Sequence, residues 1–75
     1  MQKHGPISVE QWFSGLFSSK AARDGRVVRR QLRDVDRYVR REVLKAELDR
    51  RGFHALENAG QVIIFCNQEP IRRIL

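Results

Sequence analysis

The chain of 75 residues is long enough for one small domain and too short for a second. Basic residues outnumber acidic ones by 15 to nine, which gives a net charge of +6. No uncharged stretch approaches the ~20 apolar residues of a membrane span, and the first residues lack the apolar run of a signal peptide. Secreted domains of this size usually carry several paired cysteines, whereas Cys66 is the only one here. We therefore expect a cytoplasmic protein.

The first expected element is a helix that follows a flexible tail over residues 1–6 and opens a single domain over residues 7–75. Ser8 is a typical N-cap, and Gln11 three positions later completes a capping box. Apolar residues then follow at helical spacing as one stripe: Val9, Trp12, Phe13, Leu16 and Phe17. Gly15 weakens this helix, so we expect the stripe to dock on the core.

The middle of the chain contains an ambiguous segment over residues 26–32. Asp24-Gly25 marks a turn, and the β-branched pair Val27-Val28 that follows it favours a short strand. The first turn of a long helix also fits this pattern.

Residues 34–51 have helical periodicity but two apolar faces. One face carries Val35, Tyr38, Val39 and Ala46, and the opposite face carries Leu44 and Leu48. A single straight helix cannot bury both faces against one core. We therefore predict a break near Arg40–Arg41. A short helix over residues 35–39, capped by Asp34, would precede it, and a second helix over residues 41–51 would follow.

The last third of the chain indicates a helix ending and a hairpin. Gly52 is a natural residue after a helix C-terminus, and Phe53 is placed to contact Leu48 in a Schellman motif. Strands are expected over residues 53–57 and 62–66, joined by the three residues 58–60, with the second strand central and covered on both faces. Residues 71–75 add an edge strand or dock a last turn.

Together these elements predict a small α+β domain in the order α-β-α(broken)-β-β. Its helices pack on a small antiparallel sheet that ends in a hairpin. The residues expected to be largely buried are Trp12, Phe13, Leu16, Leu48, Ile63 and Phe65.

The candidate catalytic and metal-binding side chains favour structural roles. Cys66 lies in an apolar strand run, where a buried free cysteine is common. His54 alternates with apolar neighbours, so it should face solvent or a partner, and no orienting carboxylate stands at a recognisable spacing. One cysteine and two scattered histidines cannot supply the four ligands of a zinc site. We therefore predict no enzyme activity, no cofactor and no metal.

The main functional signal is an Arg-rich segment over residues 20–41. It holds nine basic and three acidic residues and thus carries the whole net charge. Its candidate anion-binding residues are Arg26, Arg29, Arg30, Arg33, Arg37, Arg40 and Arg41. Such a segment suits nucleic acid or another polyanion, because the arginine fork matches phosphate. The alternative without a binding function is a solvated surface whose arginines pair with Asp34, Asp36, Glu42 and Glu47.

These observations favour a small non-catalytic binding protein that engages an anionic partner, nucleic acid first. The alternative is a protein–protein adaptor or homodimer that uses a sheet edge or the aromatic N-terminal helix. The helix stripe is more simply the chain's own core, since few other large apolar residues are available.

Several short segments resemble a family of short uncharacterised bacterial proteins. The similar segments are Arg-Asp-Val-Asp-Arg at 33–37, Arg-Arg-Gly-Phe at 50–53, Glu-Asn-Ala-Gly-Gln at 57–61, Phe-Cys-Asn at 65–67, and Ser-Lys-Ala-Ala at 19–22. That family often has glycine where this chain has Arg40. Some members are labelled phosphoribosylanthranilate isomerase, but that enzyme is a (β/α)₈ barrel of on the order of 200 residues or more. We attribute the label to a neighbouring gene.

Overall fold

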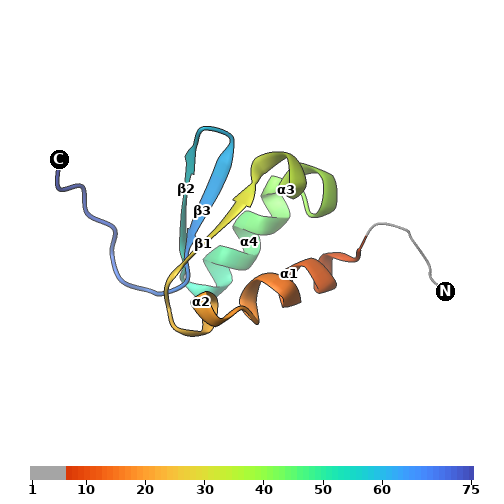
Figure 1. Ribbon diagram of the computed structural model, residues 1–75, viewed down its shortest axis with the longest axis horizontal. Coiled ribbons are helices and arrows are strands. Elements are labelled where there is room, and N and C mark those ends of the chain that lie inside the picture. Colours follow the sequence, from red (N-terminus) through yellow and green to blue (C-terminus); the bar gives the residue numbers. More distant parts are fainter. Residues whose placement is uncertain (1–6) are drawn as a thin grey trace.

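The computed structural model describes residues 7–75, and the tail expected over residues 1–6 lies outside the described residues. The elements are α1 (Val9–Phe17), α2 (Lys20–Arg23), β1 (Val27–Gln31), α3 (Leu32–Tyr38), α4 (Arg41–Arg51), β2 (His54–Asn58) and β3 (Gln61–Phe65). The strands form one antiparallel sheet in the order β1-β3-β2, and the helices gather on one side of it (Figure 1). The predicted α+β fold with a C-terminal hairpin is confirmed, with the short helix α2 as an addition.

Helix α1 begins and docks as its sequence predicts. The Gln11 N–H donates to Ser8 Oγ at 3.0 Å, and the Ser8 N–H donates to Gln11 Oε1 at 2.9 Å, which forms the capping box. Trp12 and Leu16 are buried, the latter with 1% of its surface exposed. Val9, Phe13 and Phe17 are half-buried and pack against the same core. The apolar stripe is therefore part of the core of the domain.

The predicted break between α3 and α4 lies at Arg40, which has φ 86° and ψ 142°. Because the chain changes direction there, Val35 and Val39 before the break and Leu44 and Leu48 after it are all buried in one core. The phase argument from the sequence is thus confirmed.

The start of α3 differs from the prediction. The helix begins at Leu32, directly after β1, so Asp34 lies in its first turn and does not cap it. The N-cap residue is Gln31, whose side chain makes no capping hydrogen bond. The Leu32 N–H donates instead to the Gly60 carbonyl at 2.9 Å. The sheet thereby satisfies one of the N–H groups at the start of the helix that have no partner within it, and a search for capping residues in the sequence cannot detect such a partner.

Helix α4 ends in the predicted Schellman motif. The Phe53 N–H donates to the Leu48 carbonyl at 2.9 Å, and the Gly52 N–H donates to the Asp49 carbonyl at 3.2 Å. Gly52 has φ 74°, a conformation that favours glycine. In the last turn, hydrogen bonds from Arg50 and Arg51 hold the pKa of Glu47 below its ordinary value.

The hairpin connection is shorter than predicted. Asn58 pairs with Gln61, so only Ala59 and Gly60 form the turn, where three residues were expected. Both have positive φ, 52° and 77°, which is the pattern of a two-residue type I′ turn. The prediction was wrong because Asn58 keeps its place in β2.

The two faces of the sheet have different environments. Val62, Ile64 and Cys66 are buried beneath the helices, whereas Ile63 and Phe65 point to the opposite face and are only half-buried. The expectation that the central strand is covered on both faces was therefore wrong. Of the predicted core, Trp12, Leu16 and Leu48 are buried, and Phe13, Ile63 and Phe65 are half-buried.

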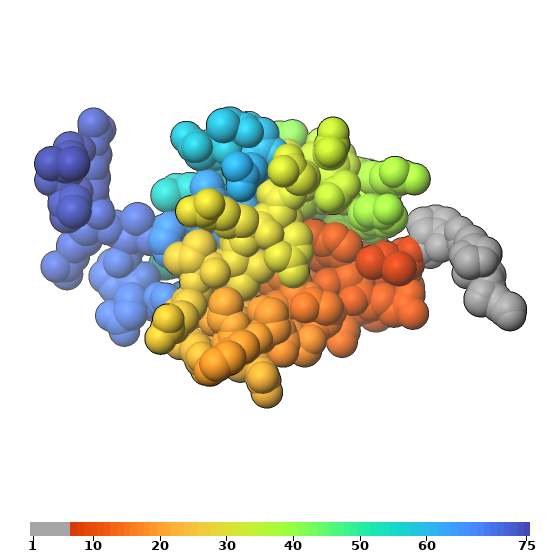
Figure 2. Space-filling model, in the orientation of Figure 1, coloured from red at the N-terminus to blue at the C-terminus, as the bar shows by residue number. Residues whose placement is uncertain are grey.

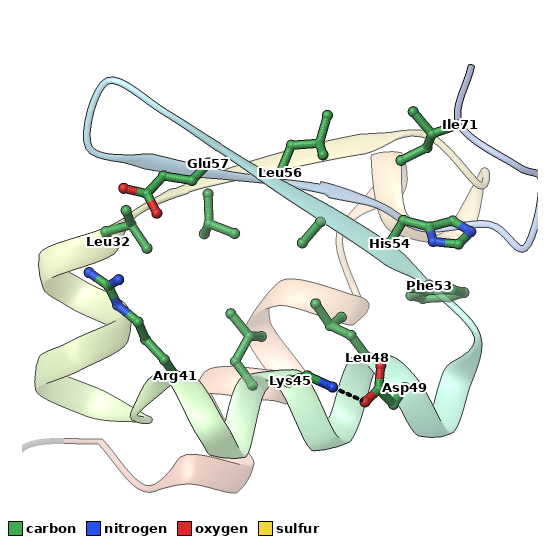
Figure 3. A pocket seen from close by; sticks show the side chains of 13 residues that line it. Leu32, Arg41, Lys45, Leu48, Asp49, Phe53, His54, Leu56, Glu57 and Ile71 are labelled. Atoms are coloured by element: carbon green, nitrogen blue, oxygen red, sulfur yellow. Dashed lines mark hydrogen bonds and ion pairs between the residues drawn. The ribbon is translucent and has the colours of Figure 1, made fainter. Parts of the chain in front are cut away.

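The described C-terminal segment adds no helix or strand to the outer face of the sheet, but Ile71 lies beside His54 and Leu56 of β2 (Figure 3). Residues 66–75 contain neither the edge strand nor the helical turn that was considered. Asn67 and Gln68 still donate hydrogen bonds to the Gly25 and Arg51 carbonyls, and the end of the segment then runs away from the domain (Figure 1). Ile74 and Leu75 are almost fully exposed. Within residues 7–75, none of the helices has both the length and the apolar character that crossing a bilayer requires.

Candidate anion-binding surface

The Arg-rich segment occupies consecutive elements on one side of the molecule. It runs through α2, β1 and α3 and ends at the first residue of α4. Figure 2 shows β1 and α3 next to each other on the face turned to the viewer, above α1. Strand β1 is an edge strand, so its outer side has no neighbouring strand.

Five of the seven predicted arginines are in no ion pair within residues 7–75. They lie before or in β1 and on α3, and they are Arg26, Arg29, Arg30, Arg33 and Arg37. Arg30 is half-buried and the other four are exposed. The Arg30 Nη1 donates to the Arg29 carbonyl at 2.7 Å, and the Arg37 guanidinium lies 5.3 Å from the centre of the Tyr38 ring. Neither contact involves a carboxylate.

The remaining two predicted arginines are paired with carboxylates. Arg40 contacts Glu42 at 2.9 Å, and Arg41 contacts Asp36 at 2.9 Å. The hydrogen bond from Arg41 to Asp36, together with the charge of that carboxylate, raises the pKa of Arg41. Arg41 lies at the rim of a groove on the β2 side of the domain, so the structure does not group it with the arginines of β1.

The arginines of β1 do not all point the same way. Arg29 pairs with Ile63 and lies on the outer face of the sheet, whereas Arg30 pairs with Val62 and lies on the helix side of the strand. Alternation along a strand causes this division. The basic surface therefore wraps around the β1 edge and extends along α3.

A groove of about 470 Å³ lies between α4 and β2 (Figure 3). Its floor is apolar and includes Leu44, Leu48 and Val62. Its rim carries two basic and two acidic side chains: Arg41, Lys45, Asp49 and Glu57. Lys45 and Asp49 are paired at 2.7 Å. Because these rim charges balance, the groove does not select an anion.

Sequence reasoning missed the open outer face of the sheet. Its central residues Ile63 and Phe65 are absent from the set of side chains packed against the core. The available signal was the pattern of residues 66–75, which have no apolar helical periodicity and so do not predict a helix that could cover this face of the sheet.

The candidate chemical groups outside the basic surface are a buried thiol and an exposed imidazole. Cys66 is buried, and its burial raises the pKa of the thiol against the weaker opposing effect of Arg51 and Arg30. His54 is exposed on β2, as predicted. Within residues 7–75, no three His, Cys, Asp or Glu side chains come together as ligands for a metal ion.

The position of Cys66 leads to a prediction about its reactivity. The nucleophile in alkylation is the thiolate, and burial both disfavours that form and blocks the reagent. We expect Cys66 to react much more slowly with iodoacetamide in the folded protein than in denaturant, measured by mass spectrometry over time near neutral pH. Equal rates in the two states would contradict the buried position.

Comparisons with known proteins found no relative of this chain. No protein-family model matches the chain, and no curated protein or solved structure shows significant similarity to it. The functional argument therefore depends on the residues of this chain.

Proposed function

We propose that the protein is a small non-catalytic binding protein whose arginines on β1 and α3 contact the phosphates of a nucleic acid. The observation that carries the proposal is the group of five arginines on adjoining elements without ion pairs within residues 7–75. Arginine suits this role because its planar fork donates two parallel hydrogen bonds to phosphate.

The competing interpretation, a solvated face neutralised by nearby acids, requires carboxylates close to these arginines. Of the four acids considered, Asp36 and Glu42 pair with Arg41 and Arg40, and Glu47 pairs with Arg50 and Arg51 of α4. The fourth, Asp34 on α3, is in no ion pair within residues 7–75. Lys20 pairs with Asp24. Within residues 7–75, three of the nine basic residues of the segment are thus ion-paired, so most of its charge is available to a polyanion.

The alternative function, an adaptor or homodimer, is favoured by the β2 edge. All five residues of β2 are exposed, and β2 contains none of the lysines or prolines that often protect an edge from pairing. The aromatic helix is less suited to this role, because Trp12 and Leu16 are in the core.

We propose that this binding takes place in the cytoplasm, because the one cysteine within residues 7–75 is buried and unpaired.

The test is a titration of the protein with labelled DNA and RNA, duplex and single-stranded, at several salt concentrations. We expect binding that weakens steeply with salt. The double variant Arg29→Ala/Arg30→Ala should bind more weakly and flatten the slope of log K against log salt by about one unit per lost phosphate contact. Its stability should change by no more than about 1 kcal/mol, because Arg29 is exposed and neither arginine is in an ion pair within residues 7–75.

The control is Arg72→Ala/Arg73→Ala, which removes the same charge from the exposed C-terminal segment. It should bind like the wild-type protein. The proposal would be wrong if nothing bound at micromolar concentrations, or if both double variants lost affinity equally. In the second case only total charge would matter. Sedimentation of the same samples would reveal a homodimer and favour the alternative.

A further inference from the structure

The outer face of the sheet consists of nine side chains in three rows across β1, β3 and β2. The rows are Val27–Phe65–His54, Arg29–Ile63–Leu56 and Gln31–Gln61–Asn58. Val27 and Leu56 are 41% and 49% exposed, and Ile63 and Phe65 are half-buried without packing on the core. The face is therefore an apolar strip with polar amides at the hairpin end. No helix or strand within residues 7–75 covers it, and Ile71 of the C-terminal segment lies beside its His54 and Leu56 (Figure 3).

The charges of the outer face limit what can cover it. None of the nine residues is acidic, and Arg29 is a cation in no ion pair within residues 7–75. The uncompensated charge of Arg26 and Arg33 lies just before and just after β1. A second copy of this face would bury two arginines with no carboxylate to pair them, which is unfavourable. An anionic partner with apolar surfaces fits better.

Two ring side chains stand side by side on this face. Phe65 of the central strand and His54 of β2 are directly opposite each other in the register, at the end of the sheet away from the hairpin turn. Side chains at opposed positions lie about 5 Å apart at Cβ. Nucleobases stack on such rings at the surface of a sheet, while arginines follow the backbone phosphates. Gln31, Gln61 and Asn58 add donors and acceptors suited to base edges.

We propose that the outer face of the sheet binds single-stranded nucleic acid, with bases on Phe65 and His54 and phosphate on Arg29. This inference rests on the proposed function and narrows it to unpaired strands. In a duplex the bases are stacked on each other and their ring faces are closed to side chains. Only an unpaired strand can use the apolar strip and the basic β1 edge together.

The test compares single-stranded and duplex oligonucleotides of one sequence by fluorescence anisotropy at low salt. The variant Phe65→Leu keeps an apolar side chain and removes the ring. We expect it to bind the single strand about five- to a hundred-fold more weakly than the wild-type protein, because each stacked base contributes strongly to affinity. Its affinity for the duplex should not change.

The matched control is Phe53→Leu, the same substitution at a residue that packs against the core. Circular dichroism of both variants checks that they fold. His54→Ala provides a second variant at an exposed side chain, where folding should be unaffected, and it should also weaken single-strand binding about five-fold or more.

The possible outcomes separate this inference from the proposed function. If Phe65→Leu and His54→Ala bind single strands like the wild-type protein while Arg29→Ala/Arg30→Ala binds weakly, nucleic-acid binding holds and the outer-face inference fails. If no oligonucleotide binds, both fail. If Phe65→Leu converts a dimer to a monomer without changing affinity for the single strand, the face joins two copies and the inference is overturned.

Discussion

Replacing Leu16 with alanine is expected to lower the free energy of unfolding by about 2–5 kcal/mol. Leu16 is 1% exposed and belongs, with Ile64 and Val35, to the largest fully buried side chains. Its truncation removes apolar contacts and leaves a cavity that α1 can fill only by shifting. A domain of this size has only a few kcal/mol of net stability, so much of the variant should be unfolded.

Urea denaturation followed by the fluorescence of Trp12 measures this loss. The control is Leu56→Ala, the same change at a side chain that is 49% exposed. It should cost less than about 1 kcal/mol, because little apolar surface returns to water. Similar costs for the two variants would show that α1 does not dock as described.

Replacing Arg40 with glycine is expected to stabilise the protein by about 1 kcal/mol. With φ 86° and ψ 142°, Arg40 lies close to a backbone region that is almost restricted to glycine, where other residues carry about 1–3 kcal/mol of strain. Glycine removes this strain. It also loses the exposed ion pair with Glu42 and has a more flexible unfolded state, each worth up to about 1 kcal/mol. Relief of strain should outweigh these losses.

The matched variant is Arg40→Ala, which loses the same ion pair but keeps a Cβ at the strained position. Thermal unfolding should place Arg40→Gly above the wild-type protein and Arg40→Ala at or slightly below it. A glycine variant no more stable than the alanine variant would show that the break carries no strain.

Local patterns predicted the elements well where the signal lies within a few neighbouring residues. The capping box of α1, the Schellman end of α4 and the break at Arg40 each depend on spacing along the chain, and each is confirmed. The errors arose where a distant segment decides the outcome. Gly60 provides the partner for the first N–H of α3, and Asn58 stays in β2 because Gln61 lies opposite.

The candidate surface likewise combines features that local sequence predicts with features that depend on distant segments. The sequence located the Arg-rich segment but could not show which arginines lack a carboxylate, because Asp36 reaches Arg41 across the break between α3 and α4. It also could not show that Phe65 and Ile63 face outward. A continuous apolar run is compatible with a strand covered on both faces, and only the fold of the described part of the chain, which places no helix or strand over this face, decides against that.

The strand order has a consequence for the order in which the sheet assembles. β2 and β3 are neighbours in sequence, so their pairing can start at the tight turn that joins them. β1 pairs with β3 only when the long intervening segment, which includes α3 and α4, has closed into a loop that brings Val27 opposite Phe65. Closing such a loop costs entropy before any contact compensates for it. The arginine-bearing strand is therefore expected to join last during folding and to detach first in local opening. A polyanion bound along β1 would then hold this strand against β3 and stabilise the folded domain against local opening.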